Sequence, residues 1–174
     1  MSKNAAVRAP EPLAARHDAS RFSNGHHPSL DAWLRDRALA SEGLSVRIYV
    51  VCAADEPDRV VGYVSIATAM EQRAVLPSAK LRRGMPDQVP LLLIARFAVD
   101  ENWGGEGVGS ALLVDALRRC LAASAIAGAR GIIAHAIDEP AVAFYDRHGF
   151  VRSPFGERIM LMPIETARQL VGGG

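Results

Sequence analysis

The sequence has few of the residues that mark disulfide-rich or metal-binding proteins. Its 174 residues include only two cysteines, Cys52 and Cys120, which lie far apart in different apolar runs. The absence of a CxxC spacing excludes a zinc ribbon or a dithiol redox motif. The histidines at 17, 26 and 27 have no cysteine or carboxylate at metal-ligand spacing, so no metal site is predicted. We expect both cysteines to be buried, reduced thiols.

Long apolar runs and a strong net charge are also lacking. No run approaches the ~20 residues that cross a bilayer, and Met1 to Pro12 lacks the apolar stretch of a signal peptide, so we expect a cytoplasmic chain without a membrane partner. The formal charge of +1 excludes a uniformly basic protein, and a nucleic-acid partner would need a local basic patch. With 49% hydrophobic and 22% charged residues, the composition is that of one globular domain.

The first half of the chain predicts a tail, a helix and a hairpin. Residues 1–20 mix alanine, proline and charged residues without periodicity, which predicts a mobile N-terminal tail. Leu30, Trp33, Leu34 and Leu39 recur near helical spacing and indicate an amphipathic helix. Two segments rich in valine, isoleucine and tyrosine flank turn residues and predict an antiparallel hairpin over 45–52 and 60–70. Residues 73–90 indicate a long exposed connection.

The second half alternates strands and helices. An apolar run over 91–99 predicts a strand buried on both faces. Four further elements follow a glycine-rich turn: a helix over 111–123, a strand over 132–136, a helix over 138–147 and a strand over 159–162. The pattern predicts an α+β domain over 21–165 and a C-terminal tail over 166–174.

The glycine-rich turn Gly104 to Ser110 lies between a predicted strand and a predicted helix. Backbone N–H groups at such a turn can converge on an anion at the positive end of the helix, which makes a candidate pyrophosphate cradle. The turn lacks the lysine of a P-loop after Gly109, and its glycine spacing differs from the dinucleotide fingerprint. The alternative interpretation is a flexible helix start.

Two segments together resemble the acetyl-CoA half of the GNAT acetyltransferase superfamily. They are Ala98-Val99-Asp100 with 103–109, and 141–145 followed by Gly149-Phe150. The resemblance implies a GNAT fold, with a central mixed, mostly antiparallel twisted sheet and flanking helices, and acetyl-CoA as co-substrate without a metal. It also implies a set of cofactor-binding residues along the pantetheine arm and the pyrophosphate: Phe97, Ala98, Val99, Gly104, Gly105, Gly107, Val108, Gly109 and Ser110.

A narrower resemblance covers the chain from about Phe22 to Pro163. It rests on Phe22, Gly25, Leu30, Asp31, Trp33 and Leu34, on Val60-Val61-Gly62-Tyr63, and on Met85-Pro86. These positions are similar to tRNA-acetylating toxins of type II toxin/antitoxin pairs. The resemblance implies acetylation of the α-amine of aminoacyl-tRNA, which blocks translation, and neutralisation by a small ribbon-helix-helix antitoxin.

The chain departs from the family pattern at two positions of the turn. Gly104 stands where the family usually has glutamine or arginine, and Glu106 stands where a basic residue is usual. A carboxylate beside a pyrophosphate is repulsive, although solvent reduces the penalty when the side chain points outward. The departures keep open a catalytically weak GNAT-like binding module as an alternative function.

Tyr145 matches the family position that stabilises the departing thiolate. A tyrosine with a pKa near 10 protonates a thiolate of pKa near 8.5 at a cost of ~1.5 units, or about 2 kcal/mol, so a hydrogen bond with partial proton transfer suffices. The alternative is a packing tyrosine. None of Glu71, Asp100 and His135 is marked as a base, and His135 is interpreted as a core histidine. Because an α-amine has a pKa near 7.7 to 8.0 and is already partly neutral at neutral pH, the lack of a marked base favours an aminoacyl ester over a lysine as the acceptor.

Four basic residues are predicted to meet the substrate. Arg73, Lys80, Arg82 and Arg83 form a positive stretch without an intervening acid that would contact tRNA phosphates, and a solvated loop is the alternative. The helix around Trp33 is either a homodimer or antitoxin surface or, by default, part of the core. A GNAT enzyme for a small-molecule or protein amine is the remaining alternative function.

Overall fold

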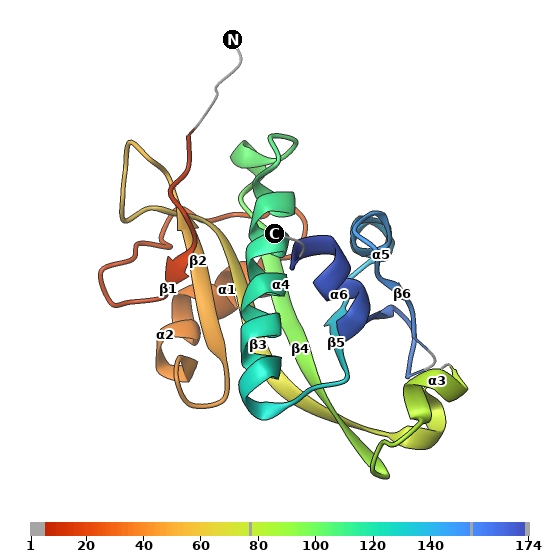
Figure 1. Ribbon diagram of the computed structural model, residues 1–174. Helices are drawn as coiled ribbons and strands as arrows, with labels where there is room; N and C mark the ends of the chain where they lie inside the picture. The colour runs from red at the N-terminus through yellow and green to blue at the C-terminus, as the bar shows by residue number, and fades with distance from the viewer. Residues whose placement is uncertain (1–5, 77, 154, 173–174) are drawn as a thin grey trace. The chain divides into compact units, whose positions relative to one another are not determined.

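The computed structural model describes residues 6–76, 78–153 and 155–172, and Figure 1 shows their path. The sheet has seven strands in the order β1-β2-β3-β4-β5-β7-β6. The strands are β1 (Glu11–Pro12), β2 (Arg47–Cys52), β3 (Val60–Gln72), β4 (Gln88–Val99), β5 (Gly131–His135), β6 (Val151–Arg152) and β7 (Ile159–Pro163). The helices are α1 (Pro28–Asp36), α2 (Ala38–Ser41), α3 (Ala79–Arg82), α4 (Val108–Ala127), α5 (Glu139–Arg147) and α6 (Ile164–Val171), with 3-10 turns η1 (Arg73–Val75) and η2 (Glu101–Trp103).

Strand pairing makes the sheet mixed and mostly antiparallel. Strands β4 and β5 are parallel, with Leu91 opposite Gly131 and Ile94 opposite Ala134. The pairs β1–β2, β2–β3, β5–β7 and β6–β7 are antiparallel. This confirms the predicted fold class. Within the described ranges, no helix combines the length and the apolar character that a membrane span requires.

The chain divides into two compact units, which are described separately. The first unit holds the residues up to Ile66 together with Arg96–Ala116, and the second holds Ala67–Ala95 together with Leu117–Gly174. Strands β3 and β4 and helix α4 each contribute residues to both units.

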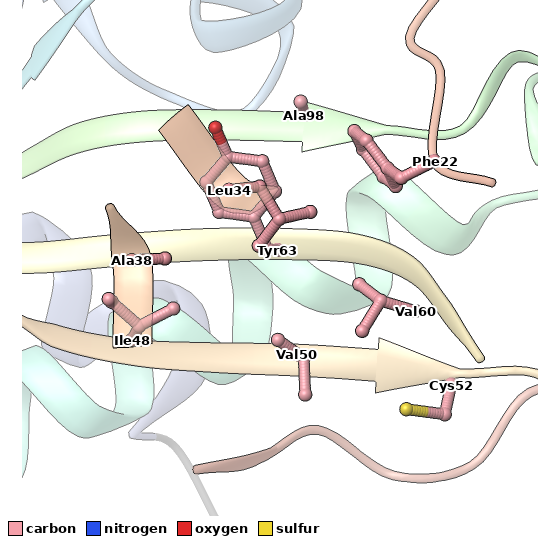
Figure 2. Packing of buried hydrophobic residues seen from close by; sticks show 9 residues of the cluster. All are labelled: Phe22, Leu34, Ala38, Ile48, Val50, Cys52, Val60, Tyr63 and Ala98. Atoms are coloured by element: carbon pink, nitrogen blue, oxygen red, sulfur yellow. The ribbon is translucent and has the colours of Figure 1, made fainter. Parts of the chain in front are cut away.

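The core of the first unit lies between α1, α2 and the strands β2, β3 and β4. Figure 2 shows the buried cluster, which comprises Phe22, Leu34, Ala38, Ile48, Val50, Cys52, Val60, Tyr63 and Ala98. The predicted amphipathic helix forms as α1 and α2, with Arg37 between them. Trp33 is half-buried and stacks on Tyr63 with a centroid distance of 6.0 Å. Trp33 therefore packs against the core, as its default interpretation expects, and its role in a homodimer or antitoxin surface stays a prediction.

Residues 6–20 belong to the first unit and do not form a free tail. β1 pairs with β2, Leu13 N donates to Ile48 O at 2.9 Å, and Asp18 N donates to Asp58 O at 2.7 Å. Leu13 and Ala19 pack against the buried cluster. The prediction of a mobile tail is wrong for these residues, because the backbone groups along β2 bind a segment that has no periodicity of its own. The rest of that predicted tail, residues 1–5, lies outside the described residues.

The second unit has its own core and corrects two further predictions. Leu76, Val89, Leu91, Ile133 and Leu161 form its buried cluster. Leu76 and Val89 come from the segment predicted as an exposed connection, which instead contains η1, α3 and the start of β4.

The predicted C-terminal tail forms most of α6. Ile164 and Ala167 are buried, and Ile164 N donates to Arg130 O at 3.1 Å. An amphipathic helix of eight residues was too short for its periodicity to be recognised. Residues 173–174 lie outside the described part of the chain.

Candidate active site

The glycine-rich turn joins the end of β4 to the start of α4 in the first unit. Gly105 and Gly107 have φ angles of +75° and +83°, a region that side chains with a Cβ adopt at a cost of about 1–2 kcal/mol. Helix α4 begins at Val108, and Ala111 N donates to Gly107 O at 3.0 Å. A Cβ placed on Gly105 or Gly107 meets no atom within 4 Å, so the turn faces open space. The first N–H groups of a helix and a flanking glycine backbone are groups that can bind an anion.

Asp100 holds the amino-terminal segment and the turn together. Its carboxylate is buried and accepts hydrogen bonds from Ser23 N at 3.1 Å and Asn102 N at 2.9 Å. Its own N–H donates to Val61 O at 2.8 Å, and Glu101 N donates to Ser23 O at 2.9 Å. The turn is thus fixed to β3 and to the segment that leads into α1. Trp103, at the end of η2, is also buried, and Arg59 lies 4.8 Å from its ring centroid.

The predicted cofactor residues of the first unit lie in one continuous stretch. Phe97, Ala98 and Val99 are the last residues of β4, and Ala98 belongs to the buried cluster of Figure 2. Gly104 and Gly105 are exposed, Val108 is buried, and Ser110 is exposed on the first turn of α4. Glu106 is exposed as well, so its carboxylate is solvated.

Tyr145 lies in the second unit, on α5. Asp138 caps this helix by accepting a hydrogen bond from Ala141 N at 2.8 Å, and Glu139 and Pro140 occupy its first turn, as the sequence predicted. The Tyr145 ring is 3% exposed and makes edge contacts with Phe144 and Phe150 at centroid distances of 5.4 and 5.2 Å. Burial raises the pKa of the Tyr145 hydroxyl above its ordinary value. The hydroxyl therefore remains protonated at neutral and moderately alkaline pH.

Asp100 and His135, two residues considered as possible bases, lie in different surroundings in the structure. The Asp100 carboxylate already accepts two backbone hydrogen bonds and is buried, which makes it a structural group. His135 is exposed at the end of β5, so its interpretation as a core histidine is wrong. The four residues of β5 before it are all buried, so the apolar run gave a misleading signal for the residue that ends the strand.

The four basic residues of the second unit play two different roles. Arg73 forms an ion pair with Asp87 at 3.2 Å and donates to Met85 O at 3.0 Å, and the half-buried Arg82 donates to Leu76 O at 2.7 Å. Lys80 on α3 and Arg83 at its C-terminus are exposed. Arg73 and Arg82 thus hold the local backbone, while Lys80 and Arg83 present charge to solvent.

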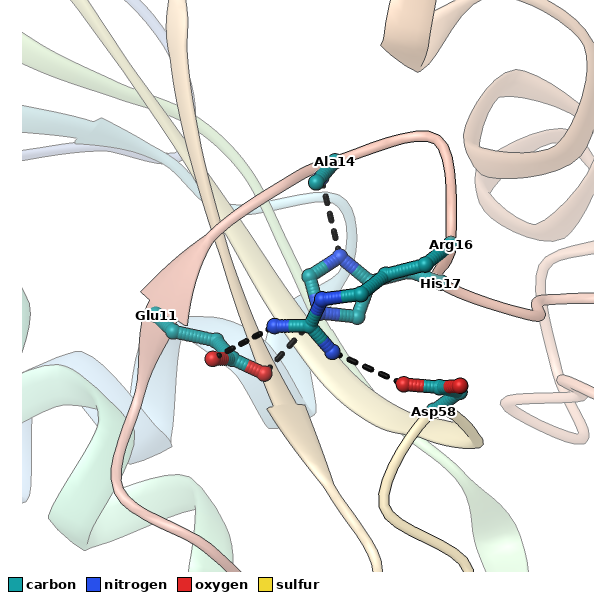
Figure 3. Close-up of polar contacts among 5 residues, drawn as sticks. All are labelled: Glu11, Ala14, Arg16, His17 and Asp58. Carbon is teal, nitrogen blue, oxygen red and sulfur yellow. Dashed lines mark hydrogen bonds and ion pairs between the residues drawn. The ribbon is translucent and has the colours of Figure 1, made fainter.

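A cluster of possible metal ligands lies beside β1. Figure 3 shows the hydrogen bond between His17 Nε2 and Glu11 Oε1 at 2.9 Å, and the ion pairs of Arg16 with Glu11 and Asp58. The donor atoms of Glu11, His17 and Cys52 lie within 4.8 Å of one another.

This cluster does not suit a metal ion in the arrangement observed. Ala14 N donates to His17 Nδ1 at 2.9 Å, so the neutral ring carries its proton on Nε2 and donates to Glu11. Burial raises the pKa of the Cys52 thiol to about 11, so it does not supply a thiolate at neutral pH. The arginine at position 16 adds positive charge next to the carboxylate. The cluster fixes the amino-terminal segment to the strands of the first unit.

Sequence reasoning missed Asp100 as a structural residue, and it missed Arg96, whose guanidinium carbon lies 4.1 Å from the ring centroid of Trp33. Asp100 carried a readable signal, because an aspartate two residues before the N–H that it caps is a common turn pattern. The bond from Ser23 joins residues 77 positions apart and has no local signal.

Comparisons with known proteins agree with this geometry. Residues 46–152 match the family model of the acetyltransferase (GNAT) domain. A tRNA-acetylating toxin of Mycobacterium tuberculosis is 40% identical over 166 residues, which cover 94% of this chain and 96% of that protein. A probable toxin TacT of Sinorhizobium fredii is 29% identical over 181 residues, which cover 97% of each chain.

Solved structures agree as well. AtaT complexed with acetyl-methionyl-tRNAfMet superposes with a TM-score of 0.86 at 25% identity, covering 95% of this chain and 99% of that one. A structure described as AtaTR bound with AcCoA superposes with a TM-score of 0.81 at 26% identity, covering 94% and 97% of the two chains. With a mixed sheet, a glycine turn leading into α4 and a family match over more than half its length, the chain belongs to the GNAT acetyltransferase family.

Proposed function

We propose that this protein is an acetyl-CoA-dependent N-acetyltransferase that acetylates the α-amine of aminoacyl-tRNA and so acts as a toxin of translation. The observation that carries the substrate assignment is the similarity, along almost the whole of both chains, to the tRNA-acetylating toxin of M. tuberculosis. The glycine turn supports the cofactor assignment, because its backbone suits a pyrophosphate.

The first unit supplies the acetyl-CoA site in this proposal. The main chain of Phe97 to Val99 binds the pantetheine arm, and the turn from Gly104 to Ser110 takes the pyrophosphate at the N-terminus of α4. The open space around Gly105 and Gly107 fits this role, because a bound phosphate needs close approach to the backbone. Acetyl-CoA supplies the activated thioester.

Tyr145 donates a hydrogen bond to the departing sulfur in this proposal. The amine nitrogen attacks the thioester carbonyl, the C–N bond forms, the C–S bond breaks, and the electron pair leaves on sulfur. Because burial raises the pKa of Tyr145, its hydroxyl acts as a hydrogen-bond donor and does not release its proton completely. A tyrosine pKa above that of the thiol makes a strong hydrogen bond, with partial transfer, the cheaper route.

No described residue needs to act as a dedicated base. An α-amine with a pKa near 7.7 to 8.0 is partly neutral at physiological pH, and the proton that it loses on acetylation can pass to solvent. A lysine amine at ~10.4 would cost about 4 kcal/mol to deprotonate at neutral pH. An aminoacyl ester is therefore the acceptor that this site suits best.

Lys80 and Arg83 are the proposed contacts for tRNA phosphates in the second unit, and Arg73 and Arg82 support the segment that presents them. We also propose a ribbon-helix-helix antitoxin as the partner that neutralises the enzyme, and the cytoplasm, where charged tRNA is found, as the site of action.

The test is transfer of labelled acetyl from acetyl-CoA to a mixed pool of charged tRNA. Uncharged tRNA and a pool of small primary amines serve as alternative acceptors, and the Tyr145→Phe variant serves as the catalytic control. We expect label on charged tRNA alone, and a large loss of that label in the variant.

Other outcomes would reject parts of the proposal. If small amines are labelled and charged tRNA is not, the protein is a small-amine acetyltransferase. Absence of acetyl-CoA binding in a titration would make the domain a GNAT-like binding module, for which the departures at Gly104 and Glu106 provide a reason.

A further inference from the structure

Arg96 is a half-buried cation that lacks an anionic partner among the described residues. It lies on β4 in the first unit, and its guanidinium carbon is 4.1 Å from the ring centroid of Trp33 on α1. No carboxylate of the described chain lies within ion-pair distance of it. The buried carboxylate of Asp31, on the same helix as Trp33, accepts hydrogen bonds from Asn24 N and Nδ2 at 3.1 and 2.6 Å.

The position of Arg96 is fixed through a chain of aromatic contacts. Trp33 stacks on Tyr63 with an interplanar angle of 17°, and Tyr63 also packs edge-on against Phe22 at 5.7 Å. The Tyr63 hydroxyl donates to Leu30 O at 2.8 Å, which ties this stack to α1. Figure 2 shows Tyr63 on β3 near the middle of the cluster. A guanidinium placed on such a rigid platform has lost much of its conformational freedom before any ligand arrives.

An arrangement of this kind is costly for stability alone. A partly buried charge without an ion-pair partner loses hydration free energy. A cation–π contact with one indole compensates for only part of that free-energy loss. The planar guanidinium has five N–H donors in a fixed geometry that matches two oxygens of a phosphate or carboxylate. The Arg96 guanidinium therefore has a geometry that suits an anion.

Arg96 lies beside the proposed acetyl-CoA segment on the same strand. Arg96 directly precedes Phe97, and successive strand residues are about 3.3 Å apart, so Val99 is only about 10 Å along the strand. Side chains alternate between the two faces of a strand, which puts Arg96 on the face of Ala98 and Tyr63, with α1. An anion bound by Arg96 would thus lie close to the proposed cofactor segment, on the face of β4 that carries α1.

We propose that Arg96, held on Trp33, binds a phosphodiester of the RNA substrate next to its esterified 3′ end. This inference rests on the proposed function, because it takes charged tRNA as the acceptor. A phosphate is favoured over a protein carboxylate, since every nucleotide near the reacting ester carries one and a single cation suffices to fix its register. Arg96 is then a binding residue that positions the acceptor, separate from the exposed Lys80 and Arg83 of the second unit.

The experiment measures acetyl transfer to charged tRNA at several salt concentrations for the wild type and for Arg96→Gln, Arg96→Lys and Trp33→Leu. We expect Arg96→Gln to raise KM for charged tRNA about fivefold to tenfold and to reduce the slope of log(kcat/KM) against log[salt] by about one, as loss of one phosphate contact requires. Arg96→Lys keeps the charge, so the salt slope should equal that of the wild type. Its KM should lie between the values of the wild type and Arg96→Gln. Trp33→Leu keeps the slope and raises KM.

The matched control is Arg37→Ala, which removes an exposed arginine between α1 and α2 in the same unit. It is expected to change KM and the slope much less than Arg96→Gln. Acetyl-CoA affinity, measured by titration, and the melting temperature are expected to stay within error of the wild type for Arg96→Gln, which separates loss of the RNA contact from loss of the fold.

The outcomes separate this inference from the proposed function. If the wild type acetylates charged tRNA and Arg96→Gln leaves KM and the slope unchanged, or changes them no more than Arg37→Ala does, the inference is overturned and the function stands. If the wild type transfers no label to charged tRNA, both the proposed function and this inference are rejected. A variant that binds tRNA normally but loses affinity for an acidic peptide would assign Arg96 to a protein carboxylate and would also overturn the inference.

Discussion

The glycine turn and Tyr145 represent two opposite ways of building a functional element. The turn, in the first unit, is exposed and is proposed to act through its backbone, with two glycines at positive φ and open space around them. Tyr145, in the second unit, is buried to 3% exposure and is proposed to act through its one hydroxyl, on a ring that packs against Phe144 and Phe150. The comparison teaches that ligand binding and rate should respond to different changes in the two units.

The largest expected effect comes from removing the Tyr145 hydroxyl. Tyr145→Phe keeps the ring contacts with Phe144 and Phe150 but removes the donor, so kcat should fall by about 100-fold or more while acetyl-CoA affinity stays the same. Single-turnover transfer and a cofactor titration measure the two quantities. A variant with normal kcat would reduce Tyr145 to a packing residue and end the contrast between the units.

Changing the glycine turn should lower acetyl-CoA affinity and leave kcat nearly unchanged, the opposite of the effect expected for Tyr145→Phe. Gly107→Val forces a β-branched residue to a φ of +83°, which costs about 1–2 kcal/mol, and it places atoms where the phosphate approaches. Acetyl-CoA affinity should fall about tenfold or more with little change in kcat at saturation. Gly107→Asn is the control, since asparagine tolerates this conformation, and it should lose less affinity. Equal losses in the two variants would assign the effect to the added side chain alone.

The basic residues of the second unit allow a finer division. Lys80→Ala with Arg83→Ala should raise KM for charged tRNA about fivefold and reduce the salt slope by about two, because two exposed phosphate contacts are lost. Arg73→Ala with Arg82→Ala should instead lower the melting temperature, because Asp87 and the carbonyl of Leu76 lose their partners. The same result from both pairs would mean that all four act only as diffuse charge.

The smallest expected effect is at Glu106. This carboxylate is exposed, so its repulsion of a pyrophosphate is screened, and Glu106→Gln should strengthen acetyl-CoA binding only about twofold to threefold at low salt. The difference should shrink in 0.5 M salt, and calorimetric titration at both salt concentrations measures it. A gain that persists at high salt would place the carboxylate in direct contact with the cofactor.

Sequence patterns predicted the elements that carry strong periodicity. The hairpin, the central strand, and the helices after the glycine turn and after Asp138 were all expected, because their apolar spacing and caps lie within a few residues. Strands β1 and β6 were missed, since two residues carry no period and only the neighbouring strand makes them strands. The helix α6 was missed because it spans barely two turns.

The residues of the candidate site also differ in how far they could be predicted from local sequence patterns. The cofactor stretch and Tyr145 were found through motifs that are contiguous in the chain, and their roles remain predictions. The buried bonds of Asp100, the contact of Arg96 with Trp33, and the support given by Arg73 and Arg82 depend on residues that are distant in sequence or on backbone carbonyls. Such contacts leave no repeating pattern for a sequence reader to detect.

The two outermost strands of the sheet, β1 and β6, are each only two residues long. Short edges present few unpaired N–H and C=O groups, and Pro12 on β1 has no N–H to offer a second chain. The strand behind β1 is apolar, with Ile48, Val50 and Val51 buried. Removing the amino-terminal segment would leave β2, a strand of six residues, as an unpaired edge of the sheet. We therefore expect this segment to protect the protein from edge-to-edge aggregation.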